Sequence, residues 1–387
     1  MIAFSALVTI AFILWGLIRK KSKTATLGLI ILLYILFAYE RSESDYLGYL
    51  EMFDQIGDGS GRALTYEYLY VLLCRVANSL HMTFDTMRKI VCFFELIFLY
   101  STIKDFTENT ALVLALFFIF PATQDAELFR WLLGMCIIIF GIKFLLKKRS
   151  ILNYFLFIIT VIVASLIHTS CWLFLIYLIL VVKDRKKLFG IVALALVVGI
   201  SLLGTGLFFS LLSYLPIRTF VIEKYQTGNY ANWRGMMFML IKQIIICMMA
   251  IIASGRLKIT KGKIVLRKIN YDNVCSLTNK GSSNVEICER INERILDLNL
   301  ASFLMLLPMF YTSSAQRLTH VVIFFNYIAL ANKCTKKRQS KSYIIYGAIT
   351  AVFLLLLLLF FESTGAVYAF KSHFTEGYFT NLFGQIF

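Results

Sequence analysis

Two residues that could act on a phosphate and on a hydroxyl lie near the ends of successive apolar segments. Arg130 comes near the start of FRWLLGMCIIIFGIKFLL, and His168 comes at the end of the next segment, in ASLIHTSCW. A guanidinium binds phosphate oxygens through paired N–H donors, and a neutral imidazole can accept a proton from a hydroxyl near pH 7. Arg130 is therefore a candidate for binding a phosphate, and His168 is a candidate for accepting a proton. The alternative for His168 is an interfacial histidine without a chemical role.

The composition predicts what kind of fold holds these residues. Of the 387 residues, 59% are hydrophobic, against about 45–50% in soluble proteins, and the mean hydropathy is +0.77. Apolar runs such as 190–212 and 344–361 have about the 20 residues that cross a bilayer core. The chain is therefore predicted to be an all-α, polytopic integral membrane protein. The first run, 2–18, lacks a small-residue cleavage site, so we expect a retained helix instead of a signal peptide.

The formal net charge of +17 would point to nucleic acid in a soluble protein. In a membrane protein the same excess arises because cytoplasmic loops collect lysine and arginine. No basic stripe is interleaved with aromatic residues, so no nucleic-acid partner is expected. The basic regions placed in the cytoplasm are 19–23, 147–150, 183–187, 255–295 and 332–341.

This placement predicts one transmembrane domain over 1–387, with about 12 transmembrane helices and both termini outside. If segment 66–82 crossed the membrane, later basic regions would lie outside instead of in the cytoplasm. We therefore expect this segment to be an amphipathic or re-entrant helix on the outer face. It lies in an outer loop, 40–88. A second outer loop covers 211–234, and a basic cytoplasmic loop covers 255–296. The expected spans are 2–18, 25–39, 89–103, 111–121, 130–146, 151–167, 171–182, 188–210, 235–254, 297–311, 318–331 and 343–361.

Arginine outnumbers lysine among the cations on the predicted outer side, by eight to three. Lysine and arginine serve equally well as general membrane-surface cations. Bidentate binding of an oxyanion such as phosphate, in contrast, favours the planar guanidinium of arginine. Arg130, Arg234 and Arg317 are the candidates for binding a lipid-linked phosphate, with Arg75 and Arg218 as further substrate-binding residues. Taken singly, each could instead extend its charge to lipid headgroups. The eight are Arg41, Arg62, Arg75, Arg88, Arg130, Arg218, Arg234 and Arg317.

The loop over 40–68 is acidic and rich in tyrosine, a composition that can bind sugars through aromatic faces and carboxylates. Its candidate substrate-binding residues are Asp45, Tyr46, Tyr49 and Glu67, and the alternative is a solvated loop. The eight cysteines are scattered without a CxxC pair, so neither disulfides nor a zinc site is expected. Two ionisable residues, Glu95 and Lys242, fall within predicted spans, where charges usually pair or serve function.

The order of these features resembles the EpsG family of Wzy-type polysaccharide polymerases. The matching stretches are SDYLGYLEMF, then TYEYLYVLLCRVANSL, then the segment from FRWLLGM to SLIHTSCW, over about 42–180. The likeness is weaker at RGMMFML (234–240) and SSAQRLTHVVIFF (313–325). The chain departs from the family pattern in three places: YEYLY lacks Pro-Gly, Trp131 follows the arginine, and Cys171 and Trp172 stand where small or apolar residues are commoner.

The resemblance implies a glycosyltransferase at the outer leaflet of the bacterial cytoplasmic membrane, making a capsular, exo- or O-antigen polysaccharide. It would transfer a growing glycan from undecaprenyl diphosphate to a hydroxyl of the next lipid-linked repeat unit. His168 would then act as general base, and Arg130, Arg234 and Arg317 would stabilise the diphosphate as it leaves. No cofactor and no metal are expected. The implied partners are the undecaprenyl-diphosphate-linked oligosaccharide, membrane lipid, and a flippase and chain-length regulator of the same pathway.

Three other functions stay open at this point. A metal-dependent lipid-sugar glycosyltransferase could use ERSESD (40–45) as its acidic ligands, and its dependence on metal would reveal it. A flippase for the same lipid-linked sugars, which is not an enzyme, would need a polar path through the membrane. An O-antigen-ligase-like enzyme would use the same donor with a different acceptor, which the sequence does not distinguish.

Overall fold

The computed structural model describes residues 2–39, 41, 43–59, 66–147, 149–203, 233–260, 263–266, 284–309, 313–334 and 340–361. These residues are mostly helical, with one antiparallel hairpin of β1 (Leu257–Thr260) and β2 (Lys263–Leu266). The chain forms two compact units. Unit 1 comprises Met1–Phe144, Phe155–Trp172 and Ile344–Phe387, and unit 2 comprises Leu145–Tyr154 and Leu173–Tyr343.

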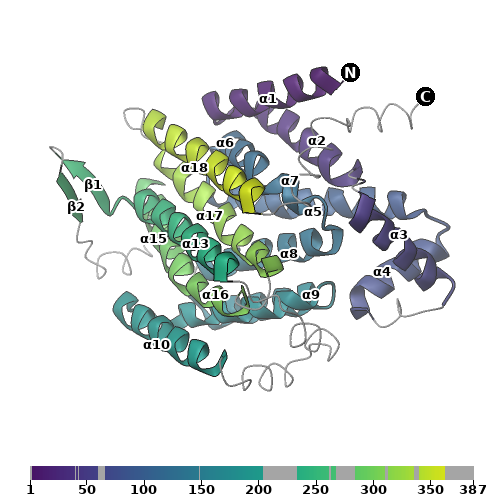
Figure 1. Ribbon diagram of the computed structural model, residues 1–387. Helices are drawn as coiled ribbons and strands as arrows, with labels where there is room; N and C mark the ends of the chain where they lie inside the picture. Colours follow the sequence, from purple (N-terminus) through teal and green to yellow (C-terminus); the bar gives the residue numbers. More distant parts are fainter. Residues whose placement is uncertain are drawn as a thin grey trace. The chain divides into compact units, whose positions relative to one another are not determined.

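Unit 1 is built on helices from the first part of the chain (Figure 1). Within it α1 packs on α2 and α6, α2 packs on α5, and α3 packs on α4. The elements that lie wholly or mainly in it are α1 (Ile2–Ile18), α2 (Lys23–Tyr39), α3 (Glu43–Gly57), α4 (Tyr68–Ser79), α5 (Phe84–Phe106), α6 (Thr110–Phe117), the π-helical turn η2 (Phe118–Ala122), α7 (Thr123–Asp125), α8 (Phe129–Lys147), α9 (Ile151–Ser165) and α18 (Ser340–Phe361).

Unit 2 is centred on three long helices, α13, α15 and α17, which pack against one another (Figure 1). α10 packs on α15, and the short elements α16 and η5 pack on α13. The elements that lie wholly or mainly in it are the 3-10 helix η3 (Thr169–Val181), α10 (Arg185–Leu203), α13 (Trp233–Ser254), β1, β2, α15 (Asn284–Ser302), η4 (Phe303–Met305), α16 (Leu306–Met309), η5 (Ser313–Arg317) and α17 (Leu318–Lys333).

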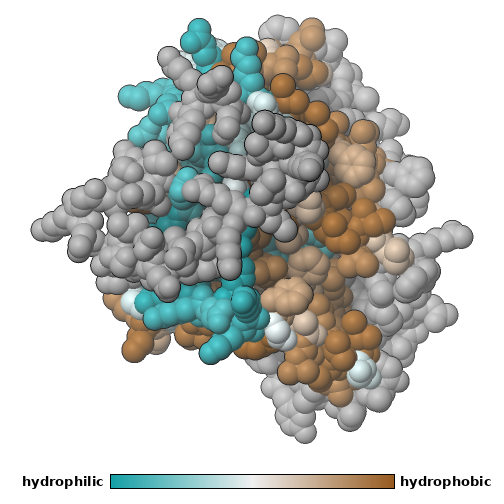
Figure 2. Space-filling view, turned by 90° about the vertical axis from the view of Figure 1, so that its left-hand side faces the viewer, coloured by the Kyte–Doolittle hydropathy of each residue, from teal (hydrophilic) through white to brown (hydrophobic). Residues whose placement is uncertain are grey.

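The helices carry apolar surface of the kind that lipid covers. Among the described residues, three helical segments are long and apolar enough to cross a membrane: Phe129–Lys147, Met237–Ser254 and Lys341–Leu359. Shorter apolar helices include Lys23–Tyr39 and Ile151–Ser165. Large hydrophobic side chains are exposed on several helices, and Figure 2 shows broad hydrophobic areas on the visible face. Monomeric soluble proteins rarely expose so much contiguous apolar surface.

Each of the twelve predicted spans overlaps a helix, which confirms the helical class. The number of crossings, the positions of the termini and the single-domain boundaries stay predictions. Two helices lie where loops were expected. α3 occupies most of the segment interpreted as an acidic loop, because Tyr46, Leu50 and Phe53 give that segment one apolar face. α15 begins at Asn284, inside the predicted cytoplasmic loop, because its many charged residues hide a periodic set of buried isoleucines and leucines.

α8 is held close to the chain that follows it by two glycines. A Cβ on Gly134 would lie 2.8 Å from Cys171 Sγ and 3.6 Å from His168 Cβ. A Cβ on Gly141 would lie 2.8 Å from Thr160 Cβ. The two 2.8 Å distances are shorter than real Cβ contacts, so a larger residue at either glycine would force its neighbour to shift. The glycines therefore permit the close approach of α8 to α9 and to the start of η3.

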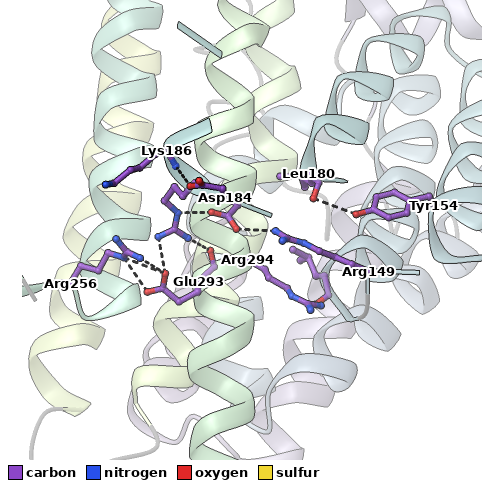
Figure 3. A network of polar contacts seen from close by, with 11 residues as sticks. Arg149, Tyr154, Leu180, Asp184, Lys186, Arg256, Glu293 and Arg294 are labelled. Atoms are coloured by element: carbon purple, nitrogen blue, oxygen red, sulfur yellow. Dashed lines mark hydrogen bonds and ion pairs between the residues drawn. The ribbon is translucent and has the colours of Figure 1, made fainter. Parts of the chain in front are cut away.

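In unit 2, two carboxylates of α15 bind arginines that lie near the ends of other helices (Figure 3). Arg185 donates to Asp297 through Nε (2.5 Å) and to Glu293 through Nη1 (2.8 Å). Arg256 donates to the same Glu293 carboxylate (2.8 Å), and Arg149 donates to Asp297 (3.3 Å). The three arginines come from three segments that the charge pattern places on one side of the membrane.

Candidate functional site

Three segments of unit 1 meet at the starts of α4 and α8 and at the end of α9. The backbone N–H groups of Leu69 and Tyr70 donate to the carbonyl of Leu166, at 2.8 and 3.3 Å. The last carbonyls of a helix and the first N–H groups of the next have no partners within their own helices, so each end satisfies the other here. This contact brings Glu67, at the N-cap of α4, beside the segment that carries His168.

Arg130 and Glu67 form a buried ion pair at this junction, with only 7% of Arg130 exposed. Glu67 Oε1 also accepts hydrogen bonds from the backbone N–H of Thr169 (3.1 Å) and from its hydroxyl (2.6 Å). Arg130 Nη2 donates both to Glu67 and to the carbonyl of Ile167 (3.3 Å). The carboxylate therefore lies at the N-termini of α4 and η3 and the guanidinium at the C-terminal end of α9, the arrangement that helix dipoles favour.

Two tyrosine rings complete the surroundings of Arg130. Its guanidinium carbon lies 4.8 Å from the ring centre of Tyr66 and 4.7 Å from that of Tyr70. Both distances suit cation–π attraction, which the planar guanidinium can combine with hydrogen bonds in its own plane. The residue is thus held by an ion pair, a backbone carbonyl and two ring faces.

His168 lies next to this cluster and is partly exposed. Its Nδ1 is 2.7 Å from Ser170 Oγ, and its ring meets the Trp131 ring edge-on at 5.6 Å. When Ser170 accepts a hydrogen bond from Nδ1–H, Nε2 carries the lone pair and can take a proton. The arrangement can therefore act as a base whose tautomer is set by a neighbouring hydroxyl.

The EpsG family matches residues 24–373 of the chain, most of its length. The chain belongs to the EpsG family. This is a family of membrane proteins of polysaccharide biosynthesis. The comparisons with curated proteins and with solved structures each returned no match.

In this EpsG family member the predicted sugar-binding tyrosines of α3 pack beside the junction. Tyr46 donates to Asp85 Oδ1 (2.9 Å), and Arg41 donates to the other oxygen of Asp85 (2.6 Å). Partial burial, and then the Asp85 carboxylate, raise the pKa of Tyr46, so its hydroxyl remains a donor at neutral pH. The ring of Tyr49 packs edge-on against that of Phe129, with 6.1 Å between the ring centres. Phe129 directly precedes Arg130 in the sequence.

The remaining candidates of unit 1 lie further from the ion pair along their helices. Asp45 is partly exposed on α3. Arg75 is exposed on α4, eight residues after Glu67, a distance of about 12 Å along a helix axis. The structure therefore does not bring Arg75 into the Glu67–Arg130 contact.

The other candidate arginines belong to unit 2 or lie outside the described residues. Arg317 is the last residue of η5, directly before α17, and its buried Nε has no hydrogen-bond partner within the described part of the chain. Arg234 lies in the first turn of α13, with its side chain outside the description. Arg218 lies outside the described residues. The convergence of Arg130, Arg234 and Arg317 stays a prediction.

Several residues of the junction were not among the sequence candidates. Thr169 and Ser170 directly follow His168, and this run of hydroxyls was the available signal. The ion pair of Glu67 and Arg130 had no such signal, because 63 positions separate the two residues. In the described ranges, no three side chains of histidine, cysteine, aspartate or glutamate gather in a way that could hold a metal ion.

Proposed function

We propose that this EpsG family protein is a polysaccharide polymerase of the bacterial cytoplasmic membrane. It transfers a growing glycan from undecaprenyl diphosphate to a hydroxyl of an incoming lipid-linked repeat unit at the outer leaflet. The observation that carries the proposal is the junction of unit 1, where the His168–Ser170 contact adjoins the Arg130–Glu67 pair. A base and a fixed guanidinium side by side are what an attacking hydroxyl and a leaving diphosphate require.

In the proposed reaction the acceptor hydroxyl oxygen bonds to the anomeric carbon of the donor glycan. The bond from that carbon to the diphosphate oxygen breaks, and its electron pair leaves with the diphosphate. The hydroxyl proton goes to Nε2 of His168, while Ser170 holds Nδ1. Arg130, Arg234 and Arg317 stabilise the charge that develops on the diphosphate, and no metal takes part.

In this proposal Glu67 positions Arg130. It also keeps the role of sugar-binding residue that we predicted from the composition of segment 40–68. Its two oxygens already accept hydrogen bonds from Arg130 and Thr169. These bonds stabilise the carboxylate, so Glu67 is a poor proton acceptor and instead fixes the position of the guanidinium. Asp45, Tyr46, Tyr49, Arg75 and Arg218 are the further proposed contacts of the substrate. The lipid-linked oligosaccharide, the flippase and the chain-length regulator are the proposed partners.

The test is the His168→Gln variant, expressed in cells that supply the lipid-linked unit. Loss of a general base lowers the rate by about 10²–10⁴-fold, so single lipid-linked units should accumulate while polymer disappears. His81→Asn is the matched control, because His81 is exposed and asparagine tolerates its positive φ of 53°. Normal polymer from His168→Gln, with equal amounts of protein in the membrane, would contradict the proposed base.

A further inference from the structure

One side of α4 exposes large apolar side chains, although this helix lies outside every predicted span. Leu72, Val76 and Leu80, the last directly after the helix, are 40%, 49% and 59% exposed. At intervals of four residues they lie along one side of the helix axis, and we call them the apolar stripe of α4. The other side, which includes Tyr70 and Cys74, is buried in a hydrophobic cluster of unit 1. Contiguous exposed apolar side chains mark a surface that binds a protein or a membrane.

Both ends of α4 are tied to the ends of other helices in unit 1. At its start, the N–H groups of Leu69 and Tyr70 donate to the carbonyl of Leu166, directly after α9. After its end, only Leu80–Thr83 precede α5. The predicted topology puts the end of α9 and the start of α5 on the same side of the membrane. The 12 residues of α4 extend about 18 Å, well short of the roughly 30 Å of a bilayer core. The helix therefore runs along the membrane surface between these two ends.

The apolar stripe borders a side of α5 that faces lipid. Ile90, Phe94 and Ile97 of α5 are exposed, and their spacing places them on one face of the predicted span 89–103. Met87 and Val91 belong to the same hydrophobic cluster as the buried side of α4. On the surface of α5 these two residues are neighbours of Ile90 and Phe94. α4 therefore packs beside the lipid-facing side of α5 at its first two turns, the level at which this span enters the membrane.

The helix that packs on α4 exposes a different kind of side chain. Figure 1 shows α3 and α4 side by side. The exposed side of α3 carries Leu47 and then Glu51 and Asp54, and Asp58 follows the helix. Anionic headgroups repel such carboxylates, and the hydrocarbon core excludes them. The charged residue exposed on α4 is Arg75, whose guanidinium can extend to lipid phosphates. Of this pair, α3 therefore turns an acidic side to water, and α4 has the side that suits lipid.

We propose that α4 is seated in the outer leaflet, with its apolar stripe among the lipid chains just below the headgroups and α3 above it in water. The sequence left open whether segment 66–82 lies on the membrane or dips into it, and the tied ends of α4 favour the first. Helices of this kind bury their apolar side about 5–10 Å into the headgroup boundary. Because Glu67 directly precedes α4, the seat also sets the depth of the Glu67–Arg130 pair. The inference concerns contact with lipid and does not depend on polymerase activity.

The test measures the depth of single positions of the full chain in phosphatidylcholine nanodiscs. The lipids carry bromine, a fluorescence quencher, either near the glycerol end or near the methyl end of their chains. A bimane fluorophore is attached to a cysteine at Val76, or in a second variant at Leu72, in a cysteine-free background. Bromine near the glycerol end should quench both labels more than bromine near the methyl end. A label at Ile97, on the exposed face of α5, should show the reverse order, and a label at Glu51 on α3 should keep its emission with both lipids.

Two results would overturn the seat of α4. Stronger quenching of Val76 and Leu72 by bromine near the methyl end, as at Ile97, would show a re-entrant helix. Emission that neither lipid quenches would show that water or another protein covers the stripe. If the label at Val76 prevents assembly, the label at Leu72 decides.

The leaflet is tested separately on intact cells. A cysteine at Ser79, which is exposed near the end of α4, should react with an impermeant maleimide from outside. Reaction only after lysis would place α4 at the cytoplasmic leaflet and overturn the outer-leaflet assignment. None of these measurements involves a sugar substrate, so a chain that makes no polymer would refute the proposed function and leave the seat of α4 intact.

Discussion

The ion pair of Glu67 and Arg130 gives the sharpest test of how the junction is held. Glu67→Gln keeps the size of the side chain and an oxygen for the two Thr169 bonds. It removes the negative charge from a pair whose side chains are 13% and 9% exposed. An uncompensated charge is then left in a nearly dry site.

The magnitude follows from that burial. Removing one partner of a buried ion pair lowers the free energy of unfolding by about 3–5 kcal/mol. The rings of Tyr66 and Tyr70 still face the unpaired Arg130 charge. Their cation–π attraction reduces the cost of that charge by about 1 kcal/mol. We therefore expect Glu67→Gln to lower the free energy of unfolding by about 2–4 kcal/mol. Arg130→Met should cost a similar amount because Glu67 is left charged. The double variant should cost less than the sum of the two, by about 2 kcal/mol.

The assay is unfolding of the purified chain in detergent, followed for the wild type, the two single variants and the double variant. Glu51→Gln is the control, since Glu51 is exposed and lies on the neighbouring helix α3, and it should change stability by less than about 0.5 kcal/mol. Single effects that add to within about 0.5 kcal/mol would refute the reasoning, because the pair would then contribute no coupling.

Further predictions concern packing, metal and topology. Gly141→Ala should destabilise by about 1–3 kcal/mol, because its Cβ would lie 2.8 Å from Thr160 Cβ; Gly190→Ala, which meets nothing within 4 Å, is the control, and equal stability of the two variants would contradict the close packing of α8. Polymerisation by the purified enzyme should continue in excess EDTA, and a requirement for divalent metal would favour the acidic-loop glycosyltransferase instead. In a cysteine-free variant, a cysteine at Ser44 should react with an impermeant maleimide on intact cells and one at Ser150 should not; labelling at Ser150 would overturn the topology.

Much of the architecture was open to prediction because a bilayer constrains a chain strongly. Apolar runs near membrane length have to form helices, since lipid offers no partner for backbone N–H and C=O groups. α1, α8 and α13 accordingly lie close to the expected bounds. Helices with a polar face were harder to foresee. In α3 and α15 charged residues interrupt the apolar ones, and the packing shows which side of each helix is buried.

The residue types of the sequence by themselves determined that this is a helical membrane protein, and the order of its motifs pointed to the EpsG family. They also singled out Arg130, His168 and Arg317, because arginine and histidine are conspicuous among apolar residues. Tertiary structure decided which side chains these residues meet. Glu67 reaches Arg130 across 63 positions, and Lys242 reaches Gln316 across 74. Such contacts depend on how helices pack, and packing depends on the shapes of many side chains at once, which no local pattern in the sequence encodes.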